Sequence, residues 1–135
     1  MASATVRWAG GQTYIGTDST NHSTVLSTTK EGVGIKPSDL LLIAIGACAS
    51  VDVVDILAKK KIILTGLDVE VTGEQDADPP WTFRKLHSHF CLRGAGMTEK
   101  AVEQAIHLAE EKYCSVAATV RPTAETTFSY EIIHD

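Results

Sequence analysis

A long apolar stretch in the first half of the chain constrains the fold more than any other feature. Its longest part without a charged residue, residues 40–51, ends at Asp52 and is shorter than the roughly 18 to 20 apolar residues that a membrane span needs. Asp39 suits the positive end of a helix, and the three lysines at 59–61 suit its negative end. We therefore predict a buried helix over residues 38–60, more than about 30 Å long at ~1.5 Å per residue.

This helix needs cover on more than one side, because apolar residues occupy nearly all of its faces. One small sheet covers a single face of a helix. A second copy of the chain would cover the rest, so we predict a homodimer.

Alternating apolar and polar positions flank the helix and predict strands. They lie before it at 4–8, 13–15 and 23–28, and after it at 67–72, 82–92 and 126–133. An amphipathic helix is expected after Thr98, followed by a short helical turn at 113–118. Because short turns join only antiparallel strands, we predict an α+β fold with antiparallel sheets around the central helix, in the order βββ-α-ββ-α-α-β. A chain of 135 residues suits one domain, 1–135.

Charge and composition bear on partners and location. The 12 Lys and Arg residues against 17 Asp and Glu residues give a net charge of -5, so we expect no nucleic-acid partner. The first ten residues lack the charged and apolar segments of a signal peptide. We therefore expect a cytoplasmic protein with no membrane partner.

The spacing of the cysteines and histidines does not match a metal-binding motif. Cys48, Cys91 and Cys114 lie far apart without a CxxC pair, which excludes a zinc ribbon and a dense disulfide scaffold. His87 and His89 share one face of a predicted strand but lack a third ligand. We expect no metal and no cofactor, and we expect Cys91 to be inert, as most buried cytosolic cysteines are.

Two motifs around the other two cysteines resemble those of a known family. A Gly34-Ile-Lys-Pro37 turn leads into the helix that carries Cys48, and Tyr113-Cys114-Ser-Val-Ala117 follows the second helix. In this order and spacing the chain resembles the OsmC/Ohr family of osmotically induced and organic hydroperoxide resistance proteins over nearly its whole length. The resemblance implies an intertwined homodimer, with the long helices at its centre and the active sites at the subunit interface.

The resemblance also implies a role for each cysteine. Cys48 would be the peroxidatic thiolate, which attacks a small hydrophobic peroxide and becomes a sulfenic acid. Cys114 would be the resolving cysteine, which converts this acid to a disulfide. A dithiol or a lipoylated protein would then restore both thiols by exchange.

A peroxidatic cysteine must be ionised near neutral pH, whereas a free cysteine has a pKa of about 8.5. Cys48 lies too far along its predicted helix for the helix dipole to act on it, so we expect a cation nearby. Physical chemistry alone favours Cys114 as the more activated thiol if it begins a short helix, because N-terminal amides lower a thiol pKa. The resemblance favours Cys48, and the two arguments conflict.

The source of the expected cation stays open. In the peroxidase branches of the family, an arginine from the N-terminal strands activates the thiolate, and a glutamate after the proline turn orients it. Thr28 and Ser38 occupy those two positions in this chain. Arg7, Lys30 or a residue of the partner subunit could replace the arginine, and Asp39 could replace the glutamate.

Three functions remain open. The first is a thiol peroxidase that reduces organic hydroperoxides and hydrogen peroxide in the oxidative stress response. The second is a non-catalytic protein that senses redox state or binds a small ligand through the same cysteines; the departures at Thr28 and Ser38 favour it. The third makes both cysteines core residues of a dimer, and their placement in two motifs argues against it.

Overall fold

The computed structural model describes all 135 residues and contains the predicted elements in the predicted order, with a π-helical turn added. The chain divides into two compact units, residues 1–41 and residues 42–135.

The N-terminal unit is an antiparallel meander. Its strands are β1 (Ala4–Trp8), β2 (Thr13–Asp18) and β3 (Ser23–Ser27), hydrogen-bonded in that order. The sequence places them to within three residues at each end. All of β1 is exposed in the single chain, so this small sheet has little core of its own.

The Gly34-x-x-Pro37 turn has a steric explanation. The hydroxyl of Ser27 accepts hydrogen bonds from the amides of Val33 and Gly34, at 3.2 and 3.0 Å. A Cβ atom on residue 34 would lie 2.6 Å from the carbonyl oxygen of Val25, which only glycine avoids. The turn then delivers Pro37 as the first residue of a helix, where its missing N–H is no loss.

That helix, α1 (Pro37–Lys59), is the predicted long helix. Its inward side contributes Ile45, Ala49, Val53 and Leu57 to the core of the C-terminal unit. Gly46 allows a close approach to the neighbouring sheet, because a Cβ there would lie 3.0 Å from a methyl group of Val71. The expectation of a fully buried helix is only partly met in the single chain, since Ile43, Val51 and Val54 are exposed.

The C-terminal sheet contains β4 (Ile63–Gln75), β5 (Phe83–Ala95) and β6 (Glu125–His134), in that order. β4 and β5 form the predicted antiparallel hairpin, but β5 and β6 are parallel. The expectation of purely antiparallel sheets is therefore wrong for this pair. A parallel pair needs a long crossover connection, and the helices between β5 and β6 supply one.

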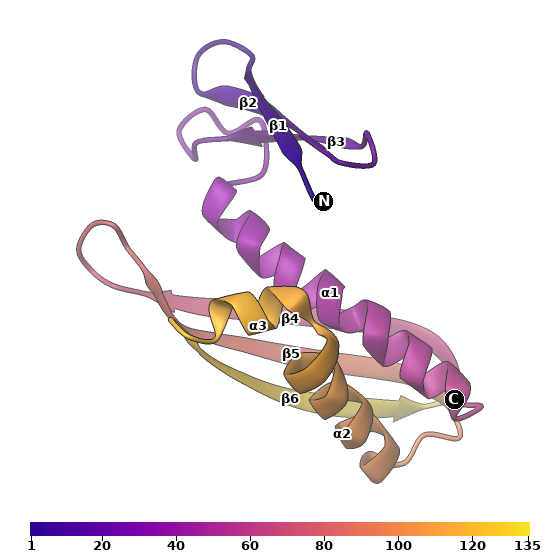
Figure 1. The fold of residues 1–135 in the computed structure, drawn as a ribbon. Helices are drawn as coiled ribbons and strands as arrows, with labels where there is room; N and C mark the ends of the chain where they lie inside the picture. The colour runs from indigo at the N-terminus through magenta and orange to yellow at the C-terminus, as the bar shows by residue number, and fades with distance from the viewer. The chain divides into compact units, whose positions relative to one another are not determined.

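The crossover runs over the same face of the sheet as α1 (Figure 1). It contains α2 (Glu99–Leu108), the π-helical turn η1 (Ala109–Tyr113) and α3 (Ser115–Val120). The hydroxyl of Thr98 caps α2 by accepting a hydrogen bond from the amide of Ala101 at 3.1 Å. No sequence pattern predicted η1. Single π-helical turns are often found at functional sites.

Candidate active site

The structure brings the two cysteines of the family motifs together. Cys48 lies on α1 and is half-buried, and Cys114 lies between η1 and α3 and is 2% exposed. Both are free thiols. The two side chains lie close enough for each thiol to shift the pKa of the other, so two cysteines far apart in the sequence form one site.

The first turn of α3 surrounds this pair with donors. Cys114 is the N-cap of α3, and its sulfur accepts a hydrogen bond from the amide of Ala117 at 3.3 Å. The amides of Ser115 and Val116 and the Ser115 hydroxyl lie near the Cys48 sulfur and lower its pKa. Free amides at the start of a helix suit an anionic acceptor. The donors therefore point at the Cys48 sulfur from another helix.

These donors favour the ionised form of Cys48. Partial burial, the largest single influence, raises the pKa of Cys48, but the hydrogen bonds from Val116, Cys114 and Ser115 together outweigh it. The pKa of Cys48 therefore lies below its usual value.

Cys114 behaves in the opposite way. Burial and the hydrogen bond to Cys48 raise the pKa of Cys114 to about 11, although the Ala117 and Val116 amides oppose the shift. The expectation that the helix start would make Cys114 the more activated thiol is wrong, because burial outweighs the amides there. The pair consists of one thiol that ionises readily and one that stays protonated.

We expect Cys48 to be alkylated faster than Cys91 or Cys114 by iodoacetamide at pH 7, because the thiolate is the nucleophile. Its rate should stay high as the pH falls below the usual cysteine pKa of about 8.5 and should drop only below the lowered pKa. Peptide mass spectrometry over a pH series measures all three rates in one sample. Equal rates at Cys48 and Cys91 throughout the series would contradict the expectation.

The other predicted site residues lie in the N-terminal unit. Arg7 is exposed on β1, Lys30 is exposed after β3, and Asp39 lies in the first turn of α1. The Thr28 hydroxyl donates to the Gln12 side chain at 2.7 Å. Within residues 42–135, the groups that lower the pKa of Cys48 are uncharged donors and not cations. Sequence reasoning missed the Ser115 and Val116 amides, because a backbone amide leaves no signal in residue type.

The outward face of β5 carries Cys91 in a polar ladder. His87 bonds to the hydroxyls of Thr127 and Ser129, at 2.7 and 2.8 Å. His89 bonds to Ser129 at 2.7 Å and to Glu131 at 3.4 Å. Burial, followed by Glu131 and Asp68, raises the pKa of Cys91, so this thiol differs from Cys48 both in its place in the fold and in its ionisation.

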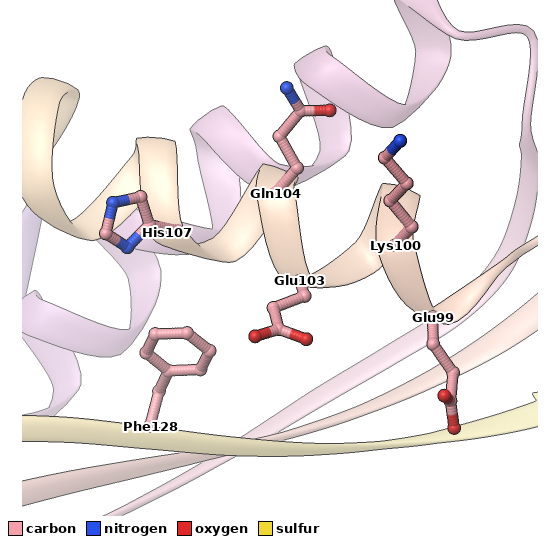
Figure 2. Close-up of a pocket in the computed structure, with 6 residues that line it drawn as sticks. All are labelled: Glu99, Lys100, Glu103, Gln104, His107 and Phe128. Atoms are coloured by element: carbon pink, nitrogen blue, oxygen red, sulfur yellow. The ribbon is translucent and has the colours of Figure 1, made fainter.

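A shallow hollow of about 560 Å³ lies between α2 and β6, away from the cysteines. Figure 2 shows Phe128 rising from β6 toward α2, with the Glu103 carboxylate on the same side of the helix. The remaining lining residues, Glu99, Lys100, Gln104 and His107, are polar. The hollow contains neither Cys48 nor Cys114, so it is separate from the paired thiols.

Glu110 is an unusual residue next to the site. It lies in η1, is 4% exposed, and its Oε1 atom has no hydrogen-bond partner. Burial and then the nearby Glu111 raise the pKa of Glu110 to about 7, while Arg121 acts in the other direction. The folded protein thus keeps this carboxyl protonated at pH values where the unfolded chain has lost the proton.

A raised carboxyl pKa contributes stability that is complete below the unfolded pKa of 4.5 and is lost as the pH rises to about 7. We expect this loss to reach about 3 kcal/mol. Glu110→Gln should remove it, so the variant should be more stable than the wild type at pH 8 and not at pH 4. Urea unfolding at both pH values measures the difference, and the exposed Glu125→Gln should behave as the wild type does. Parallel stability curves for wild type and Glu110→Gln would contradict the expectation.

The comparisons with known proteins concern the family and the fold of the chain. Residues 29–129 match the family described as OsmC-like protein. Protein YhfA of Escherichia coli K12 is 32% identical over 130 residues, covering 96% of this chain and 97% of YhfA. A solved structure from Aquifex aeolicus VF5 has a TM-score of 0.90 at 27% identity and covers 100% of this chain and 98% of that one. The organic hydroperoxide resistance protein OhrB of Bacillus subtilis has a TM-score of 0.65 at 14% identity, covering 97% of this chain and 98% of OhrB.

Fold and site together define an α+β protein with a paired thiol, in which one sulfur is held by the amides of a second helix. The chain belongs to the OsmC/Ohr family of OsmC-like proteins. Members of this family are soluble proteins. By length and composition α1 is long and apolar enough to cross a membrane, a property that the core helices of soluble proteins share.

Proposed function

We propose that this protein is a thiol-dependent peroxidase that reduces organic hydroperoxides, and hydrogen peroxide as a second substrate, in the oxidative stress response. The observation that carries the proposal is the asymmetric pair, in which the pKa of Cys48 is lowered and the pKa of Cys114 is raised. A nucleophile that ionises beside a thiol that stays protonated suits the two steps of a cysteine peroxidase.

In the first step the Cys48 thiolate attacks the terminal oxygen of the hydroperoxide. The O–O bond breaks, Cys48 becomes a sulfenic acid, and the alkoxide takes up a proton and leaves as an alcohol. The sulfur loses two electrons and the peroxide gains them. Hydrogen bonds from Ser115 and Val116 hold the sulfur as a thiolate until the attack.

In the second step the Cys114 sulfur attacks the sulfenic acid of Cys48. An S–S bond forms, the S–O bond breaks, and the hydroxyl leaves as water with the proton from Cys114. The Cys48 and Cys114 side chains lie close enough to shift each other's pKa, which supports a resolving step without a large movement. This step makes Cys114 the resolving cysteine.

An external dithiol completes the cycle. Its thiolate attacks the disulfide, forms a mixed disulfide, and its second thiol releases both protein cysteines in reduced form. A small dithiol or a lipoylated protein supplies the two electrons. The overall reaction converts hydroperoxide and dithiol to alcohol, water and an oxidised dithiol.

Residues 1–135 would act as one domain of a cytoplasmic homodimer. Support comes from α1, whose side chains Ile43, Val51 and Val54 are 51%, 69% and 45% exposed in the single chain. Exposed aliphatic residues aligned on one apolar helix are typical of a surface that a second subunit covers. The same apolar wall would accommodate the alkyl part of a hydrophobic peroxide.

The deciding experiment is peroxide consumption by the purified protein with excess dithiol or reduced lipoamide. Cumene hydroperoxide should be consumed faster than hydrogen peroxide, because only the former offers an apolar part to bind. Cys114→Ser should prevent formation of the intramolecular disulfide after one equivalent of peroxide. Consumption no faster than that of the reductant alone would end the peroxidase proposal.

A redox-sensing protein that forms the disulfide without efficient turnover is the second candidate. The absence of the family's arginine and glutamate at Thr28 and Ser38 favours it. The two functions differ in one measurement. A sensor forms the Cys48–Cys114 disulfide stoichiometrically but is reduced by dithiol too slowly for repeated cycles, whereas a peroxidase cycles many times.

A further inference from the structure

The short helix α3 requires support from outside itself. It contains only six residues, Ser115–Val120, and isolated helices of this length are unstable. Its Ala117 amide donates to the Cys114 sulfur at 3.3 Å, and its Ser115 and Val116 amides lie near the Cys48 sulfur. The contacts that hold α3 in place are therefore also contacts that hold the donors of the thiolate in place.

Arg121 connects the segments before and after Cys114. Its backbone N–H donates to the carbonyl oxygen of Ala117 at 2.9 Å and closes α3. Its side-chain Nη2 donates to the carbonyl oxygen of Glu110, in η1, at 2.5 Å. A hydrogen bond from a guanidinium is stronger than one between neutral groups. One side chain thus ties the end of α3 to the turn that precedes Cys114.

The surroundings of this tie are unusual. Arg121 Nε is buried without a hydrogen-bond partner, and so is Oε1 of the Glu110 carboxyl. Buried polar atoms without partners are rare in native proteins. Glu111 is the other charged group that acts on the Glu110 carboxyl. The only charge-assisted hydrogen bond that Arg121 makes here is the one to the Glu110 carbonyl.

We propose that Arg121 is a positioning residue of the active site: through its bond to the Glu110 carbonyl it holds the Ser115 and Val116 amides against the Cys48 thiolate. The proposal rests on the thiolate role of Cys48 in the proposed function, but it does not depend on peroxide turnover. Arg121 acts through α3 and does not itself touch the reacting atoms.

The test is the pH titration of Cys48 in the folded Arg121→Met protein. The rate of iodoacetamide alkylation at each pH is measured on the Cys48 peptide by mass spectrometry. We expect the midpoint to rise by about one pH unit, which slows alkylation at pH 7 about tenfold. Arg121→Lys keeps the charge but loses the planar guanidinium group, so we expect a smaller rise of the Cys48 midpoint. Arg84→Met is the matched control, since Arg84 is an exposed arginine that pairs with Asp76. The Cys91 peptide should titrate alike in all four proteins.

An Arg121→Met protein with native circular dichroism and an unshifted Cys48 midpoint would overturn the proposal. If Arg121→Met does not fold, Arg121→Lys decides: a raised midpoint supports the proposal, and an unchanged midpoint overturns it. A shift of Cys91 equal to that of Cys48 would indicate general loosening and would also overturn it. A wild-type protein that consumes no peroxide, yet shows the shift on substitution, would refute the proposed function alone.

Discussion

Replacing Cys48 by serine is expected to abolish peroxide consumption, with a fall in kcat/KM of at least about 1,000-fold. A serine hydroxyl in the same place has no accessible anion near neutral pH and does not form a sulfenic acid. The Ser115 and Val116 amides would remain, but the nucleophile that they stabilise would be gone. The measurement is cumene hydroperoxide loss at pH 7 with excess reduced lipoamide.

Cys91→Ser is the matched control for this variant. Cys91 lies on the outward face of β5, where burial, Glu131 and Asp68 raise its pKa, so its replacement should leave turnover within about twofold of the wild type. Rapid turnover that survives in Cys48→Ser would remove Cys48 from the role of nucleophile. Turnover that depends on Cys91 would move the reaction to the other face of the sheet.

Replacing Phe90 by alanine is expected to lower the free energy of unfolding by about 3–5 kcal/mol. Phe90 is completely buried, on the central strand of the C-terminal sheet, and belongs to the core cluster beneath α1 and α2. Removing its ring leaves a cavity that this close-packed core cannot fill. Urea unfolding at pH 7 and a fixed protein concentration measures the loss.

Ile63→Ala provides the comparison for Phe90→Ala. Ile63 begins β4 and is 69% exposed, so its truncation should change the free energy of unfolding by less than about 0.5 kcal/mol in the single chain. A Phe90→Ala protein as stable as Ile63→Ala would mean that the core is not centred on β5. Reduced activity in Phe90→Ala is expected to follow its unfolded fraction.

Much of the fold could be predicted because its elements leave local signals. The apolar run 40–51, with Asp39 before it and the lysines at 59–61 after it, predicted a helix over 38–60, which agrees with α1 to within one residue at each end. Thr98 predicted the start of α2, because its hydroxyl can cap a helix N-terminus. The parallel pairing of β5 and β6 could not be predicted in this way, because it depends on where the crossover returns the chain.

The candidate site shows the same division. The motifs singled out Cys48 and Cys114, and both are found in one site. Their ionisation was harder to judge, because it depends on how deeply each sulfur is buried and on which donors surround it. The helix-start argument for Cys114 considered the amides and not the burial, which proved to be the larger influence.

The sequence by itself determined the family, the α+β class, the order of elements and the two cysteines, because each of these is carried by residue type, periodicity or motif. Only the tertiary structure decided which thiol ionises. The Ser115 and Val116 amides reach Cys48 across the fold, and Arg121 returns to the Glu110 carbonyl. Backbone donors have the same chemistry at almost every position, so only their placement in space distinguishes the donors that stabilise a thiolate from the rest.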